Sequence, residues 1–201
     1  MQAVAALLIA MNLLPNPSFE EGGEMPDGWL PESEQCAWVN EAHTGERAVA
    51  VTGDGSDSTY WRTEPDADLD LEAAGLYEFS TWMRREEGAS GGAITGPSFA
   101  NRDVRPSDEW SRTAHVFHVP NVDPEGYVRV GHWRAQGTFF FDDARIVPVT
   151  AVHVERGDLT LGDGEVIADG TYTAQGAPGG YGGNYSRSLY YHTAHYNSSR
   201  W

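Results

Sequence analysis

The stretch between residues 76 and 85 sets a tryptophan and an arginine on one side of an expected β-strand. Side chains alternate between the two faces of a strand, so every second residue shares a face. One face carries Tyr77, Phe79, Thr81 and Met83, and the other carries Glu78, Ser80, Trp82 and Arg84. Since the first set is the more apolar, we expect it to pack inward and to leave Trp82 and Arg84 outside.

The stretch between residues 127 and 134 has a similar arrangement. Val128 and Val130 point one way, while Arg129 and Trp133 point the other. An exposed indole ring can stack on the apolar C–H face of a pyranose, and a guanidinium can donate hydrogen bonds to its hydroxyls. The two stretches therefore indicate sugar recognition. The alternative for each tryptophan is ordinary packing, because tryptophan is highly buried on average.

The elements that must position these residues are short strands. The chain has 201 residues, with 23 Gly and 11 Pro scattered as turn signals and 11% aromatic residues. Strands are expected at 35–40, 48–52, 59–63, 76–85, 112–119, 127–134 and 138–147, and loops at 53–57, 87–92 and 121–126. Seven strands at this spacing predict an all-β protein with a β-sandwich or jelly-roll domain over residues 12–149.

Both ends of the chain differ from this central part. Residues 1–11 are apolar and read as a truncated export signal, with a first strand as the alternative; the run is too short to span a bilayer. Residues 150–201 are poor in aliphatic side chains and are expected to be an incomplete second β-rich domain or an extension. A Gly-Asp-Gly turn at 162–164 predicts a hairpin over residues 158–167.

The order of motifs along residues 12–149 resembles one protein family. The chain opens with Asn-Leu-Leu-Pro-Asn-Pro-Ser-Phe-Glu-Glu-Gly at 12–22 and Pro-Asp-Gly-Trp at 26–29. A Thr-Gly turn at 44–45, a Gly turn at 75, a Glu-Trp pair at 109–110 and Phe-Phe-Phe-Asp-Asp at 139–143 follow. These motifs are similar to those of carbohydrate-binding modules with the galactose-binding-like β-sandwich, of which families four, nine and twenty-two are nearest in pattern.

This resemblance implies a sugar-binding site on a concave sheet or on the loops at its edge. By position, Trp61 looks like the loop aromatic that lines the cleft of the xylan-binding relatives. The other candidates for sugar contact are Trp82, Arg84, Trp133 and Trp38. Trp29 and Trp110 correspond to positions where the family buries a tryptophan, so we expect both to be structural.

The resemblance also implies a structural Ca²⁺ ion. If the first and last strands pair, the carboxylates of Glu20 and Asp142 come together near the Thr-Gly turn at 44–45. Carboxylate and carbonyl oxygens are the ligands that Ca²⁺ takes. The expected ligands are these two side chains and the backbone carbonyls near Ser18 and Arg47. The alternative is that Asp142 and its neighbour belong to a solvated strand end.

Charge and the motifs together narrow the function. The formal net charge is -17 and all 13 cationic residues other than histidine are arginine, so a nucleic-acid partner is not expected. The sequence predicts a non-catalytic module that binds a polysaccharide or oligosaccharide, secreted or at the cell surface, and attached to further domains of a larger chain. Two alternatives remain open: a structural or adhesion spacer without a sugar site, and a fragment of a polysaccharide-degrading enzyme.

Overall fold

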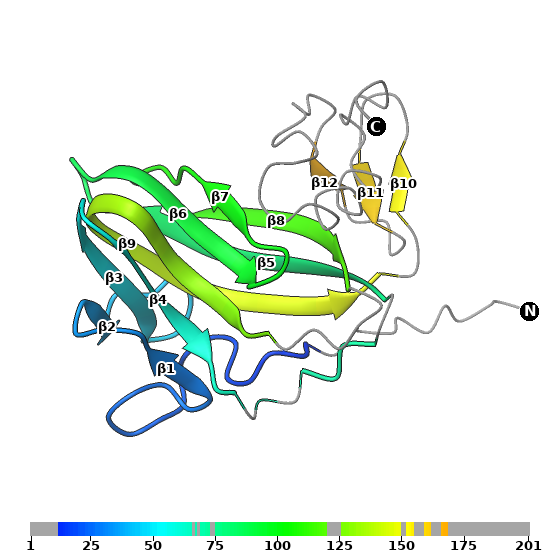
Figure 1. The fold of residues 1–201 in the computed structure, drawn as a ribbon, viewed down its shortest axis with the longest axis horizontal. Coiled ribbons are helices and arrows are strands. Elements are labelled where there is room, and N and C mark those ends of the chain that lie inside the picture. Colours follow the sequence, from blue (N-terminus) through cyan, green and yellow to red (C-terminus); the bar gives the residue numbers. More distant parts are fainter. Residues whose placement is uncertain are drawn as a thin grey trace, which may run out of the picture.

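The computed structural model describes residues 12–65, 67, 69–72, 75–119 and 126–149, together with the backbone of three short strands beyond them. Within this part of the chain there are strands and no helices (Figure 1). The strands are β1 (Trp29–Pro31), β2 (Cys36–Val39), β3 (Ala48–Asp54), β4 (Ser58–Thr63), β5 (Leu76–Arg85), β6 (Ser90–Pro97), β7 (Arg102–Val104), β8 (Ser111–His118), β9 (Val128–Pro148), β10 (Val152–Val154), β11 (Leu159–Leu161) and β12 (Val166–Ala168). The predicted all-β fold is confirmed.

Strand β9 organises the sandwich because it belongs to both layers. Its first half pairs with β4 and β6, and its second half pairs with β3 and β5, always antiparallel. We call the layer β8-β5-β9-β3-β2 sheet A and the layer β7-β6-β9-β4-β1 sheet B. Figure 1 shows β9 running along sheet B, turning at the left of the view and returning along sheet A. Arg134 and Gly137 have positive φ angles of 48° and 91° at this turn.

The core lies between the two sheets and consists of the inward set of each strand. From β5 the expected inward residues are all buried, while Trp82 and Arg84 on the other side are partly exposed. The largest side chains without solvent contact include those of Trp29, Phe19, Phe79, Phe117, Phe139 and Phe141. The inward set read from the sequence is therefore correct for β5, although Glu78 and Ser80 of the other set are buried as well. Burial of the core rings supplies the main driving force for folding.

The opening segment lies along the second half of β9, as expected for first and last strands that pair. The side chain of Asn12 donates to the carbonyl of Ala144 (2.9 Å) and accepts from the amide of Ile146 (2.9 Å). The rings of Phe19 and Trp29 lie 4.9 Å apart in the core, and both residues are fully buried. The structural role predicted for Trp29 is thus confirmed.

Two expectations about the strands were wrong. The predicted loop 87–92 contains the start of β6, a strand that its glycines conceal because glycine has low β propensity. Pairing with β7 on one side and β9 on the other holds this segment extended. The predicted strands 127–134 and 138–147 are one continuous strand, β9.

Beyond the sandwich the structure describes a three-stranded antiparallel sheet in the order β10-β11-β12. The pairing of β11 with β12 confirms the predicted hairpin, although its turn at 162–165 lies outside the described residues. Residues 1–11 also lie outside them. The division of the chain at residues 11 and 149 therefore stays a prediction.

Candidate functional site

Trp61 does not line a cleft, and the prediction that it does was wrong. Its side chain is 2% exposed, and its indole N–H donates to the carbonyl of Ala50 at 3.1 Å inside the sandwich. The cause is the alternation along β4, which turns Thr59, Trp61 and Thr63 inward. The same alternation turns Tyr60 and Arg62 outward, and these two residues occupy the surface that the sequence assigned to Trp61.

The remaining candidates lie on opposite layers and do not form one cluster. Trp82 and Arg84 belong to β5 and face outward from sheet A. Trp133 lies on the first half of β9, opposite Ser58 of β4, and faces outward from sheet B. It is 47% exposed, so its ring has a free surface. A single ligand on one layer contacts one group or the other.

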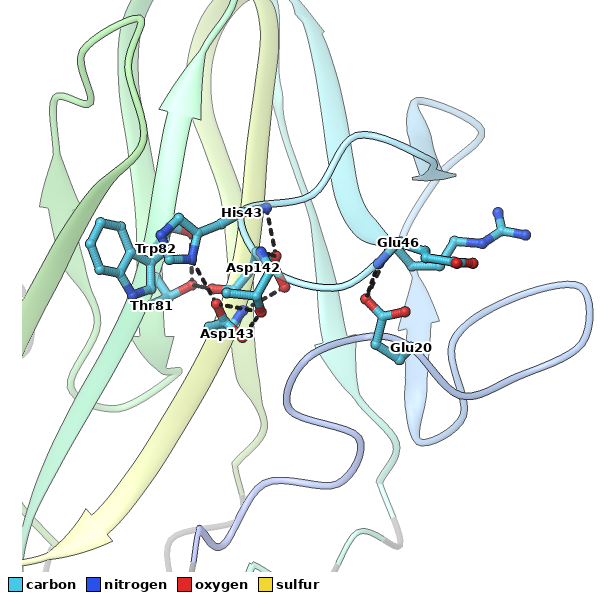
Figure 2. Close-up of polar contacts among 9 residues, drawn as sticks. Glu20, His43, Glu46, Thr81, Trp82, Asp142 and Asp143 are labelled. Carbon is cyan, nitrogen blue, oxygen red and sulfur yellow. Dashed lines mark hydrogen bonds and ion pairs between the residues drawn. The ribbon is translucent and has the colours of Figure 1, made fainter.

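The surroundings of Trp82 and Arg84 differ from those of Trp133. The imidazole of His43 stacks on Trp82 with 3.8 Å between ring centroids and 13° between ring planes, so it covers one side of the indole (Figure 2). Arg84 forms an ion pair with Glu41, and its guanidinium lies 4.0 Å from the centre of the Phe140 ring. Burial lowers the pKa of Arg84. Both side chains thus help to hold the segment around His43.

Trp38 is half-buried and is already engaged. Its indole N–H donates to the carbonyl of Phe19 at 2.7 Å, and the guanidinium of Arg47 lies 4.4 Å from its ring centre. The first contact ties β2 to the opening segment. The second covers the ring with a cation from the turn that precedes β3.

Sheet B carries a compact set of aromatic and cationic side chains on its outer face. We define the tyrosine–arginine face as Tyr60, Arg62, Tyr127, Arg129 and Trp133. In the register of the sheet, Trp61 lies opposite Val130 and Arg62 opposite Arg129, which brings the two arginines onto neighbouring strands. Tyr60 lies opposite Gly131, which has no side chain to cover the tyrosine. This face is therefore the candidate functional site.

The geometry of the tyrosine–arginine face is set by the two tyrosines. Their hydroxyl oxygens lie 3.1 Å apart and their rings are stacked, with centroids 5.8 Å apart. The guanidinium carbon of Arg129 lies 5.1 Å from the ring centre of Tyr60, and that of Arg62 lies 5.5 Å from the ring centre of Tyr127. These distances are in the range of cation–π attraction. Arg62 is also paired with Glu32 at 3.1 Å.

Burial, followed by the hydrogen bond with Tyr127, raises the pKa of Tyr60 to about 12. The hydroxyl of Tyr60 consequently stays protonated at neutral pH and can donate and accept hydrogen bonds. The face thus combines hydroxyl groups, guanidinium donors and one exposed indole. These are the groups that recognise a polar ring molecule with an apolar side.

Sequence reasoning missed Tyr60, Arg62 and Tyr127. The signal for the first two was available, because alternation in 58–63 places them on the side opposite Trp61. Tyr127 precedes β9 and comes into contact with Tyr60 through the pairing of β4 with β9. That pairing joins segments 67 residues apart and has no local signature.

The residues predicted to bind a cation hold one turn, at residues 43–47, from its two ends. Glu20 accepts hydrogen bonds from the amides of Glu46 and Arg47, both at 2.9 Å through Oε1. Asp142 accepts from the amides of His43 (2.8 Å) and Thr44 (3.0 Å) through Oδ2. Figure 2 shows the carboxylates of Glu20 and Asp142 against different parts of the turn. Both do lie against the Thr-Gly turn, as the sequence predicted.

The side chains predicted to bind Ca²⁺ are engaged in hydrogen bonds to backbone amides in this arrangement. Oδ1 of Asp142 accepts a further hydrogen bond from the amide of Asp143 at 2.7 Å, so both of its oxygens face N–H donors. Arg47 presents its amide, rather than its carbonyl, to Glu20. A calcium ion needs six to eight oxygen ligands around one point. Calcium binding, including a role for Ser18, stays a prediction from the resemblance.

Asp142 and Asp143 are joined to His43 and Thr44 in a closed network. Nδ1 of His43 lies 2.8 Å from Oδ2 of Asp143, and the hydroxyl of Thr44 donates to Oδ1 of the same carboxylate at 2.8 Å. Burial raises the pKa of Asp142 to about 6, against the lowering effect of the amide hydrogen bonds. Asp142 is fully buried, so its raised pKa reflects a structural position out of reach of a substrate.

Comparison with known proteins identifies the fold. No family model matches the sequence, and no curated protein matches it. A xylan-binding module of family 22, from Paenibacillus barcinonensis Xyn10C, has a similar structure with a TM-score of 0.52. It is 15% identical, and the match covers 71% of this chain and 97% of that module.

Two further structures give the same result. A family 16 carbohydrate-binding module is 19% identical with a TM-score of 0.50, over 68% of this chain and 99% of that one. An arabinose-bound α-L-arabinofuranosidase matches over 70% of this chain but only 27% of its own, with 15% identity and a TM-score of 0.52. The chain therefore has the β-sandwich fold of carbohydrate-binding modules. Within the described residues, no helix is long and apolar enough to cross a membrane.

Proposed function

We propose that this protein is a non-catalytic carbohydrate-binding module that holds a polysaccharide chain on the tyrosine–arginine face. The observation that carries the proposal is the 47% exposure of Trp133 on the same outer face as Tyr60 and Arg129. A ring exposed to this extent leaves apolar surface in contact with water, and a pyranose stacked on the ring removes that surface from water. The guanidinium and hydroxyl groups beside it supply hydrogen bonds that fix the sugar's orientation.

The fold supports this class of function and a setting in a larger protein. The similar module from Paenibacillus barcinonensis is a xylan-binding domain, and the arabinofuranosidase has a sandwich of this kind as part of an enzyme. By analogy, the protein acts outside the cell or at its surface, as an accessory module of a carbohydrate-active or surface protein. Fold-level similarity alone warrants this part of the proposal.

A structural or adhesion spacer is the second candidate function. It is favoured by the packing of Trp61, Trp82 and Trp38, all of which are committed to contacts within the protein. On this hypothesis Trp133 is an isolated exposed ring of no functional meaning.

Affinity electrophoresis in gels containing xylan, β-glucan or alginate tests the proposal. We expect retardation in at least one gel, and we expect Trp133→Ala to remove it. The matched control is Trp82→Ala, which truncates a tryptophan on the outer face of sheet A. Retardation that survives Trp133→Ala but is lost in Trp82→Ala would move the site to sheet A. No retardation by any polysaccharide would favour the spacer.

A further inference from the structure

We propose that the sugar chain bound on the tyrosine–arginine face carries negative charge, and that Arg129 pairs with a carboxylate of a uronic acid residue. This inference rests on the proposed function and goes beyond it by naming the class of sugar. It starts from the environment of the Arg129 guanidinium, which is placed for an anion that the protein itself does not supply.

Arg129 has a buried donor with no acceptor. In the part of the chain that the structure describes, Nε of Arg129 is the only buried side-chain nitrogen of an arginine without a hydrogen-bond partner. Buried polar groups are nearly always hydrogen-bonded, and a charged one without a partner is the costlier exception. The guanidinium carbon of Arg129 lies 5.1 Å from the ring centre of Tyr60 and 6.0 Å from that of Tyr127.

Some arginines of the sandwich have carboxylate partners, and others, such as Arg134 beside Trp133, form no ion pair with a described residue. On the same face Arg62 is paired with Glu32, and on sheet A Arg84 is paired with Glu41. Arg129 forms no ion pair with a described residue, although the chain carries 30 acidic residues against 13 cationic ones. In such an acidic protein an arginine that lies near two tyrosine rings and forms no ion pair with a described residue is available to an external anion.

A carboxylate matches this position in geometry as well as in charge. The planar guanidinium offers two parallel N–H groups to the two oxygens of a carboxylate, a pairing stronger than one with neutral hydroxyls. The hydroxyls of Tyr60 and Tyr127 lie beside it and can donate to the same group or to the ring hydroxyls of the sugar. Trp133, four residues further along β9 on the same outer face, can stack on a neighbouring sugar of the chain.

The acidic surface of the protein opposes a polyanion only at long range. Exposed charges are screened over about 8 Å at physiological ionic strength, so a direct contact with Arg129 outlasts the repulsion from distant carboxylates. Carboxylates also border this face: Glu32 is paired with Arg62, Asp57 precedes the residue opposite Trp133, and Asp103 on β7 is separated from β9 by β6. None of the three forms an ion pair with Arg129.

Isothermal titration at physiological salt tests the inference with matched ligands. Polygalacturonate and alginate are compared with their carboxyl-reduced, neutral derivatives, and a sulfated galactan forms a third arm. We expect the uronate chains to bind at least about tenfold more tightly than the reduced chains, the equivalent of about 1.4 kcal/mol. Tighter binding of the sulfated galactan alone would assign the anion to a sulfate ester instead of a uronate.

The variants decide whether Arg129 is responsible. Arg129→Gln should bring the affinity for the charged chains down to the affinity for their reduced derivatives, and Arg129→Lys should retain part of the preference for charged chains. The control is Arg145→Gln, which removes the same charge from the part of β9 in sheet A. Melting temperatures of all three variants report on folding. Equal binding of charged and reduced chains, or a preference that survives Arg129→Gln, would overturn the inference and leave the proposed function intact. If the wild-type protein binds none of the polysaccharides, the proposed function itself is refuted.

Discussion

The hydroxyl oxygens of Tyr60 and Tyr127 lie 3.1 Å apart, and their hydrogen bond joins β4 to the residue that precedes β9. The contact fixes the two rings in parallel on the outer face of sheet B, with Arg62 and Arg129 against them. A side chain held in place before the ligand arrives loses little conformational entropy on binding. The pair thus preorganises the tyrosine–arginine face.

Replacing Tyr60 with phenylalanine should weaken polysaccharide binding and lower the free energy of unfolding by about 1 kcal/mol. The substitution keeps the stacked ring but removes the hydroxyl, so Tyr127 loses its partner and a bound sugar loses one donor. A neutral hydrogen bond contributes about 1 kcal/mol, which corresponds to roughly a fivefold loss of affinity. Titration calorimetry with the best polysaccharide measures this. Unchanged affinity would mean that the hydroxyl pair is outside the binding surface.

Gly131→Ala should destabilise the sandwich. An added Cβ would lie 2.3 Å from the carbonyl oxygen of Thr59 and 2.4 Å from Cβ of Tyr60. One of these atoms belongs to the backbone of β4, so the strands themselves must separate, and overpacking of this kind costs about 1–3 kcal/mol. Urea unfolding measures the loss. Gly23→Ala serves as the control for space, because a Cβ there meets nothing within 4 Å. Equal stability of Gly131→Ala and the wild type would contradict the close packing of β4 and β9.

His115 should make the protein less stable in acid. Burial lowers the pKa of His115 to about 3, from an ordinary value near 6.5, so the folded state resists protonation that the unfolded chain accepts. Its contribution to stability is complete above pH 6.5 and is lost progressively as the pH falls from 6.5 towards 3. Urea unfolding between pH 4 and 7.5 should therefore show a shallower rise of stability with pH in His115→Leu than in the wild type. His118→Leu is the control, and an identical pH dependence of His115→Leu and the wild type would contradict the assignment.

Asp142 should have the opposite pH dependence. Its pKa is raised to about 6 by burial, so the folded state binds a proton that the unfolded chain has released above pH 3.8. Its contribution to stability is present below pH 3.8 and is lost as the pH rises through 6. The effects of Asp142 and His115 therefore oppose each other between about pH 4 and 6. In the same series of urea titrations, the free energy of unfolding of Asp142→Asn should rise more steeply with pH than that of the wild type. A shallower rise would contradict the raised pKa of Asp142.

Chelation should leave the melting temperature unchanged. The amide hydrogen bonds from the turn to Glu20 and Asp142 hold the strand ends without a cation. Differential scanning calorimetry with and without EDTA measures this, and Glu20→Ala should lower the melting temperature under both conditions. If EDTA lowers the melting temperature of the wild type and Asp142→Ala removes that effect, the Ca²⁺ site predicted from the resemblance is present.

The sequence predicted most of the architecture because strand alternation and turn residues are local signals. It predicted the inward set of β5, the burial of Trp29 and the position of Glu20 and Asp142 against the Thr-Gly turn. It failed at Trp61, because the alternation of β4 decides where the ring points, and the similar position in the xylan-binding relatives does not.

The candidate site was less predictable than the fold because it depends on which strands are neighbours. Trp82 and Trp133 each face outward from a strand, and the sequence cannot show that these strands lie in opposite layers. The start of strand β6 was missed for the same reason, since its glycines give no β signal and its pairing with β7 and β9 holds it extended. Long-range pairing decides both cases.

The sharing of β9 between the two sheets has a mechanical consequence. This strand is hydrogen-bonded to β3, β4, β5 and β6, so the layers cannot slide apart without breaking it free from partners on both sides. A pull transmitted through a polysaccharide attached near Trp133 enters the strand whose other half anchors the opening segment through Ala144 and Ile146. A load at the proposed sugar face therefore acts on a strand that is hydrogen-bonded in both layers, and not on an edge strand with a single partner.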